Sequence, residues 1–229
     1  MALEQVARPG SLAELAYDKL RTAVLDGHFR PGEKVSVVTL AAELGMSRSP
    51  VRAALERLVN EGLIRLTAGG ALIAEPSRDE LLEALVVRCA LEGLAARLAA
   101  PSLNQADLDH LRAIHDRLDR AVQAGDTGAV RAADLEFHQQ VQAHSGNACL
   151  VENLTRIQSK IMIATYSTPW GPHLADMLSE HTAILRALER RDPESAHAAA
   201  THHLTNHLER LKVAWQRAPE ESLAASGGL

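Results

Sequence analysis

The chain of 229 residues is long enough for two modest domains, each with its own hydrophobic core. A net charge of −5 argues against a uniformly basic nucleic-acid coat protein, and 46% apolar residues with only 3% aromatic residues favour helices over sheets. Cys89 and Cys149 form no CxxC motif, which excludes zinc-finger and thioredoxin-like sites, and no apolar run approaches the roughly 20 residues of a membrane span, so we expect a cytoplasmic protein without a membrane partner.

Residues 11–75 carry the pattern of a winged helix-turn-helix. Apolar side chains recur at helical spacing in three segments, and Ser11, Ser36 and Ser47 precede them as N-cap residues. Two β-rich runs follow and predict a hairpin. The predicted helices span 12–26, 37–44 and 48–61, and the predicted strands span 63–67 and 71–74.

From residue 79 onward the sequence shows only helical patterns, separated by proline and glycine. The predicted helices span 79–99, 105–124, 127–144, 148–166, 173–190 and 194–216. We therefore predict a mainly α protein, in which the winged helix-turn-helix is followed by an all-α six-helix antiparallel bundle at 76–217. The tail at 218–229 is expected to be disordered.

The start of the predicted helix 48–61 carries hydroxyl and guanidinium groups. In a helix-turn-helix the N-terminal end of the second helix enters the major groove of DNA. Serine hydroxyls suit phosphates, and arginines suit phosphates or guanine edges. Candidate contacts with double-stranded operator DNA are therefore Ser47, Arg48, Ser49 and Arg52; the alternative is a solvated basic face.

A carboxylate and an imidazole share the apolar face of the predicted helix 127–144. Asp134 and His138 lie four residues apart and are accompanied by Phe137 and Val141. Aspartate and histidine at this spacing can hold a metal ion, but they need one or two further ligands from other helices. The alternative is a pair of hydrogen-bonded core residues.

Three other histidines are candidates for the missing ligands. Apolar neighbours on one helical face indicate that His181 points inward. In the last helix, His203 and His207 both flank the apolar stripe, and periodicity slightly favours His207. The residue pattern alone leaves these two open.

The N-terminal motifs resemble those of a known family. The segment LDGHFRPGEKV, followed by LAAELGMSRSPVRAALERLVNEGLI, is similar to the DNA-binding domain of GntR-family transcriptional regulators. This resemblance implies that Ser47, Arg48, Ser49 and Arg52 contact operator DNA. The wing tip Thr67-Ala68-Gly69-Gly70 lacks the arginine that the family often places there, so a contact of the wing with the minor groove stays open.

The second half resembles the FCD effector domain of the FadR-type GntR subfamily, through D…FH, EH..IL.AL..RD and a final HL. The resemblance implies a divalent metal held by Asp134, His138, His181 and His203, with His207 as the alternative to His203. One carboxylate and three imidazoles suit Zn²⁺ or Ni²⁺. The motif from Arg88 to Glu92 implies that Arg88 binds the carboxylate of an effector; the alternative is an internal salt bridge between these two residues.

We therefore interpret the chain as a homodimeric transcriptional regulator and not as an enzyme. Its operator affinity is expected to depend on a small organic acid bound at or near the metal. Two alternatives are that the metal itself is the signal, or that the bundle is a helical metalloenzyme with a DNA-binding appendage. The sequence contains neither an HExxH nor a GxSxG motif, which argues against the metalloenzyme interpretation.

Overall fold

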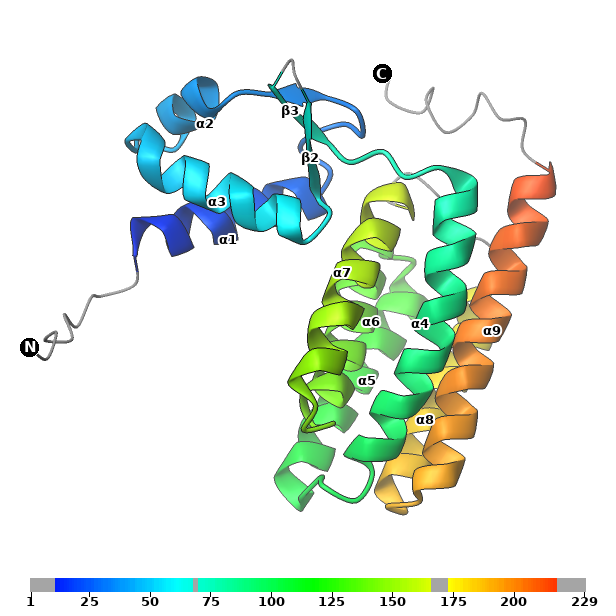
Figure 1. Ribbon diagram of the computed structural model, residues 1–229. Helices are drawn as coiled ribbons and strands as arrows, with labels where there is room; N and C mark the ends of the chain where they lie inside the picture. Colours follow the sequence, from blue (N-terminus) through cyan, green and yellow to red (C-terminus); the bar gives the residue numbers. More distant parts are fainter. Residues whose placement is uncertain (1–10, 68–69, 166–172, 218–229) are drawn as a thin grey trace, which may run out of the picture. The chain divides into compact units, whose positions relative to one another are not determined.

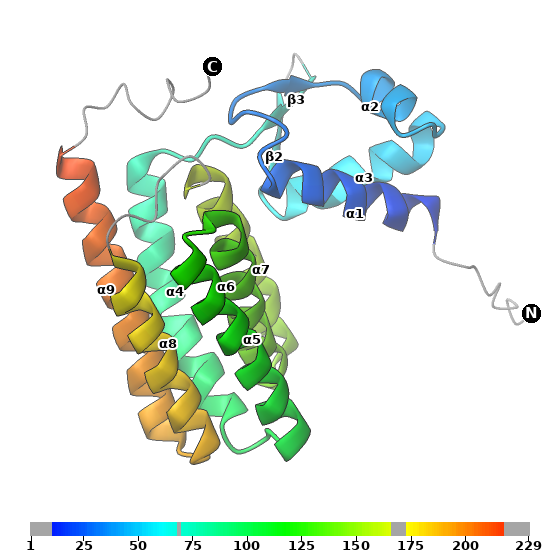
Figure 2. The same cartoon turned by 180° about the vertical axis from the view of Figure 1, so that it is seen from behind.

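The computed structural model describes residues 11–67, 70–165 and 173–217. The chain divides into two compact units, which Figures 1 and 2 show from opposite sides. One unit comprises the chain up to residue 77 together with 159–166, and the other comprises 78–158 and the chain from 167 onward. The tail 218–229 and the wing-tip residues 68–69 lie outside the described residues.

The first unit is a winged helix-turn-helix, as predicted. Its helices are α1 (Leu12–Leu25), α2 (Val37–Glu43) and α3 (Arg48–Asn60), and its strands are β1 (Lys34–Val35), β2 (Ile64–Thr67) and β3 (Gly70–Ile73). The strands form an antiparallel sheet in the order β1–β3–β2, with Ile64 opposite Ile73 and Lys34 opposite Leu72. Strand β1 was not predicted, because two residues are too few to show an alternating pattern.

Serine side chains cap two of these three helices. Ser11 forms a capping box with Glu14, in which each side chain binds the other residue's backbone N–H group. The Ser36 hydroxyl accepts a hydrogen bond from the Thr39 N–H at 3.1 Å. Ser47 occupies the N-cap position of α3, but its side chain makes no capping hydrogen bond, contrary to our expectation.

An interlocked polar group joins α1 to the end of α3. The Tyr17 hydroxyl donates a hydrogen bond to Glu61, and the Arg21 Nε lies 3.1 Å from the other oxygen of that carboxylate. The Arg57 guanidinium lies 3.7 Å above the Tyr17 ring, a favourable cation–π distance. Burial, followed by the hydrogen bond to Glu61, raises the pKa of Tyr17 to about 12. These contacts fix α3 against α1, over a core that Val51 and Leu58 seal.

The second half is a bundle of six helices, which confirms the predicted fold class. They are α4 (Arg78–Ala99), α5 (Gln105–Ala124), α6 (Thr127–Ala143), α7 (Ala148–Thr165), α8 (Leu174–Glu189) and α9 (Pro193–Arg217). Helix α9 packs along α4 and α8, and α5 packs against α6 and α8 (Figures 1 and 2). Within the described part of the chain, no helix is both long enough and apolar enough to cross a bilayer.

Helix α4 approaches α9 closely at Gly93. A Cβ atom added to this glycine would lie 2.9 Å from the Nδ1 of His197 and would also collide with the Thr201 hydroxyl. Both atoms would lie too close to the added Cβ for ordinary van der Waals contact. The absence of a side chain at Gly93 therefore sets how closely these two helices pack.

We expect Gly93→Ala to lower the free energy of unfolding by about 1–3 kcal/mol, because the helices must separate or their side chains must take strained rotamers. The matched control is Gly128→Ala in α6, where the nearest atom to an added Cβ is the Asp126 Oδ1 at 3.5 Å. This control should be neutral or slightly stabilising. Urea unfolding followed by circular dichroism measures both variants. A Gly93→Ala protein as stable as wild type would contradict the close-packing account.

Candidate functional site

The four candidate DNA-contacting residues lie together at the beginning of α3. Ser47, Arg48, Ser49 and Arg52 are all exposed, whereas Val51 and the later apolar residues of the helix face the core. Because Ser47 makes no capping hydrogen bond, its hydroxyl is not committed to the end of its own helix. The exposed end of α3 thus presents two hydroxyls and two guanidinium groups on one surface.

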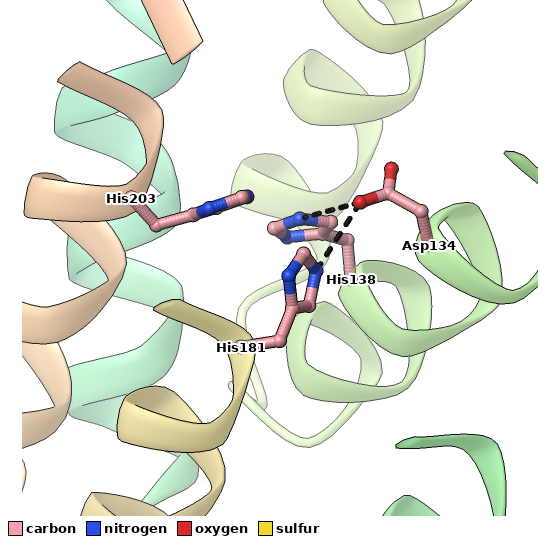
Figure 3. A group of neighbouring side chains, drawn as sticks. All are labelled: Asp134, His138, His181 and His203. Atoms are coloured by element: carbon pink, nitrogen blue, oxygen red, sulfur yellow. Dashed lines mark ion pairs between the residues drawn. The ribbon is translucent and has the colours of Figure 1, made fainter. Parts of the chain in front are cut away.

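The four candidate metal ligands come together from three helices of the bundle. Asp134 and His138 belong to α6, His181 belongs to α8 and His203 belongs to α9 (Figure 3). One ligand atom from each residue can be chosen so that all four lie within 4.8 Å of one another. The three histidines are at most 3% exposed, so the cluster lies inside the bundle. These four residues could hold a metal ion.

Two imidazole nitrogens face the same carboxylate oxygen. The Nε2 of His181 lies 3.2 Å from the Asp134 Oδ1, and the Nε2 of His138 lies 3.8 Å from it (Figure 3). Neither buried nitrogen is aligned for a hydrogen bond with any described residue. A buried polar atom without a partner costs about 1–3 kcal/mol. A cation between these atoms would remove that cost, so the donor set fits a bound metal.

The protonation states of the cluster also suit a metal. Burial alone would raise the pKa of Asp134, but the contact with His181 and the charges of His138 and His181 outweigh it and hold that pKa far below its usual range. Burial, followed by the proximity of His181, lowers the pKa of His203 well below that of free histidine. At neutral pH the site therefore offers an ionised carboxylate and a neutral imidazole, the forms that bind cations.

The structure places His203, not His207, in this cluster. His207 lies one turn further along α9, where the positive charge of Arg88 acts on it. Burial first, and then that positive charge, lower the pKa of His207 to about 4. The slight preference of the helical period for His207 was therefore misleading about which ring joins the other three.

Arg88 is buried beside the cluster and forms the internal salt bridge that was the alternative to effector binding. Its Nε donates to the Glu92 Oε1 at 3.1 Å, and the Gln142 Nε2 donates to the same oxygen at 3.0 Å. The second oxygen of Glu92 lies 3.4 Å from the Nδ1 of His138. Burial opposes ionisation of Glu92, but His138 and then Arg88 outweigh it and lower its pKa to about 2.

Two residues of this region were not predicted from the sequence. Gln142 donates a hydrogen bond to Glu92, the carboxylate that joins Arg88 to His138, and Glu180 lies 2.8 Å from the Nδ1 of His203. Gln142 follows His138 by four residues, so the helical period could have revealed it. Glu180 precedes the inward-facing His181 directly, and adjacent helical positions point about 100° apart, so periodicity gave no signal for it.

Comparison with known families identifies the chain. Residues 12–73 match the family described as bacterial regulatory proteins, gntR family, and residues 83–206, more than half of the chain, match the FCD domain. The chain belongs to the GntR family of bacterial transcriptional regulators and carries a C-terminal FCD domain. Both resemblances found in the sequence are therefore confirmed.

Relatives of this GntR-family protein are transcriptional regulators, not enzymes. The chain is 30% identical to the probable D-xylose utilization operon transcriptional repressor of Paenarthrobacter nicotinovorans, over 86% of this chain and 88% of the relative. It is 27% identical to the regulator McbR of Escherichia coli, over 73% and 78% of the two chains. The solved structure of E. coli McbR/YncC has the same fold, with a TM-score of 0.80 at 24% identity, covering 90% of this chain and 100% of that one.

We expect the purified protein to bind one divalent cation per chain and to lose thermal stability when a chelator removes it, because a ligand bound only to the folded state stabilises that state. His203→Ala should abolish binding, whereas His207→Ala, a matched control one turn away, should retain it. Elemental analysis and melting curves with and without Zn²⁺ or Ni²⁺ measure both. Metal loss in His207→Ala alone would show that the cluster is not the metal site.

Proposed function

We propose that this GntR-family regulator binds double-stranded operator DNA through α3, and that a small organic acid bound at a divalent metal in the bundle controls its operator affinity. The assignment gives residues 11–75 the DNA-binding role and residues 76–217 the roles of metal binding, effector binding and dimerisation. The observation that carries it is the buried convergence of Asp134, His138, His181 and His203 in a chain that also carries a helix-turn-helix. Such a regulator acts on the bacterial chromosome, which places it in the cytoplasm.

The exposed start of α3 supports the DNA-binding part of the proposal. Arg48 and Arg52 are free of the core, because Val51, Leu55 and Leu58 hold the helix from its other side. In this assignment Ser47 and Ser49 bind phosphates, and the two arginines bind phosphates or guanine edges in the major groove.

The charge of the bundle site supports an anionic effector. Glu92 is paired with Arg88 in a buried ion pair, and Glu180 is paired with Arg210 in a half-buried one, so both pairs are formally neutral. A metal binds imidazole in its neutral form, so Asp134 would supply the one negative charge among its protein ligands. A divalent cation then leaves the centre with a net charge of about +1, which attracts an organic acid and not an amine. The four protein ligands suit Zn²⁺ or Ni²⁺.

Arg88 is well placed to recognise the same effector. Among the described residues only its Nε makes a hydrogen bond, to Glu92. The two terminal nitrogens of the guanidinium are then available for a carboxylate, which arginine binds in a bidentate manner. In this assignment Arg88 would bind a carboxylate of an effector that lies at or near the metal.

Homodimerisation is supported by an apolar stripe on α4. Val87, Leu94 and Leu98 recur at helical spacing on one face and are between 36% and 49% exposed. Exposed apolar side chains in a row are characteristic of protein interfaces. A dimer would present two α3 helices to two operator half-sites.

A second candidate is that the metal itself is the signal. It is favoured by the depth of the cluster, whose ligand atoms already lie within 4.8 Å of one another and need no organic ligand to complete a four-donor set. The two candidates are separated by measuring operator affinity in metal-stripped protein, metal-loaded protein, and metal-loaded protein with a panel of small carboxylates. A change on adding metal alone favours the second candidate, and a change only with a carboxylate favours the first.

We expect Arg52→Ala to weaken binding to the protein's own promoter region by about 1–3 kcal/mol if the arginine reads a base. Arg120→Ala, which removes an exposed positive charge from the bundle, is the control for net charge. Fluorescence anisotropy at fixed salt measures both, against random DNA of equal length. Equal affinity for promoter and random DNA would refute operator recognition, and equal losses in both variants would show a general charge effect.

We expect Val87→Glu to convert a dimer into monomers, because each subunit would place a charge in an apolar interface. Val213→Glu, at a valine of α9 that is 44% exposed, introduces the same change off the stripe and should leave the dimer intact. Sedimentation equilibrium distinguishes the two states. A dimer that survives Val87→Glu would place the interface elsewhere.

A further inference from the structure

The three histidines of the cluster each have their outer ring nitrogen, Nδ1, next to an acceptor. The Nδ1 of His203 lies 2.8 Å from the Glu180 Oε2, and the Nδ1 of His181 lies 3.0 Å from the backbone carbonyl of Met177. The Nδ1 of His138 is 3.4 Å from the Glu92 Oε2. A ring that donates Nδ1–H must present an unprotonated Nε2, which is the nitrogen available to a metal.

We propose that Glu180 is a positioning residue for the metal: it fixes the tautomer and the direction of the His203 ring, and so sets the affinity of the site. This inference rests on the proposed metal-binding function. Glu180 does not belong to the four-residue cluster, and it acts on the metal only through His203. A carboxylate that accepts the Nδ1–H also makes the opposite nitrogen more basic, and hence a better ligand.

Glu180 suits this role because its own carboxylate cannot rotate freely. Arg210 donates to both oxygens, at 2.8 Å each, and Asn206 donates to Oε1 at 2.7 Å. His203, Asn206 and Arg210 are spaced by three and four residues, so one face of α9 holds the Glu180 side chain of α8. The carboxylate is therefore preorganised before His203 donates to it.

The contact is stronger than the corresponding contact at His138. The 2.8 Å distance at His203 is that of a charge-assisted hydrogen bond, whereas 3.4 Å at His138 is long for one. His203 is also the only member of the cluster that α9 supplies. Loss of its orientation would remove one of four ligands without disturbing the other three.

The test measures metal affinity in Glu180→Gln by competition with a chelator of known affinity, using Zn²⁺ and then Co²⁺. A neutral amide can donate or accept, so it no longer fixes the His203 tautomer. We expect about 10- to 100-fold weaker binding and an altered visible spectrum of the Co²⁺ form, which reports ligand geometry directly. Glu189→Gln in the same helix, where the carboxylate pairs with Arg112, is the matched control and should match wild type.

A second variant separates orientation from packing. Arg210→Met removes the ion pair but leaves the Glu180 carboxylate next to His203. It should therefore lower the affinity for the metal much less than Glu180→Gln does. Urea unfolding of the metal-free proteins checks that each variant folds. If Glu180→Gln does not fold, Glu180→Asp takes its place, because the shorter side chain withdraws the carboxylate from His203.

Three results decide the matter. Wild-type affinity and spectrum in the folded Glu180 variant would overturn the proposal. Equal losses in Arg210→Met and Glu180→Gln, with a Co²⁺ spectrum like that of wild type in both, would also overturn it, because the His203 ligand would then keep its orientation and Glu180 would act only by holding α8 against α9. Absence of metal binding by the wild-type protein would instead refute the proposed metal site itself, a failure that is distinguishable from the other two.

Discussion

The Asp134 carboxylate and the imidazoles gathered around it form the contact on which the proposed function of the bundle depends. An ionised carboxylate inside a protein is costly unless partners stabilise it. Here α6 and α8 direct the His138 and His181 Nε2 atoms toward one oxygen of Asp134, and α9 brings His203 to the same place. The rings of Phe137 and His181 pack edge to face with their centroids 5.1 Å apart, so an apolar side chain contacts the polar cluster.

Around that contact, buried and half-buried charges occur in compensated pairs. Glu92 is held by Arg88 and Gln142, and Glu180 is held by Arg210 and Asn206. Removing one partner of a buried ion pair leaves an uncompensated charge, which is strongly destabilising. The two networks therefore give His138 and His203 fixed partners, and in the proposed function the charge of a bound metal would be left to an external anion. Such an anion can regulate operator binding only if the DNA-competent and DNA-incompetent states bind it with different affinity.

Helical periodicity predicted most of the fold and much of the cluster, because both depend on which residues share a face. Asp134 and His138 follow from their spacing of four, and His181 from its apolar neighbours. The choice between His203 and His207 could not be made this way, because both flank the apolar stripe of α9 and the crossing with α8 selects between them. Glu180 was not predicted, since its role depends on residues of α9 that no local pattern connects to it. Strand β1 and the uncapped Ser47 were missed because two residues and one hydroxyl carry little periodic information.

The central claim is that Asp134 and three imidazoles hold a divalent metal inside the bundle. X-ray absorption spectroscopy of the metal-loaded protein at the metal edge tests it most directly. The account predicts three imidazole ligands and at least one oxygen ligand, with no sulfur in the first coordination shell. A sulfur ligand, or a spectrum with fewer than two imidazoles, would contradict it.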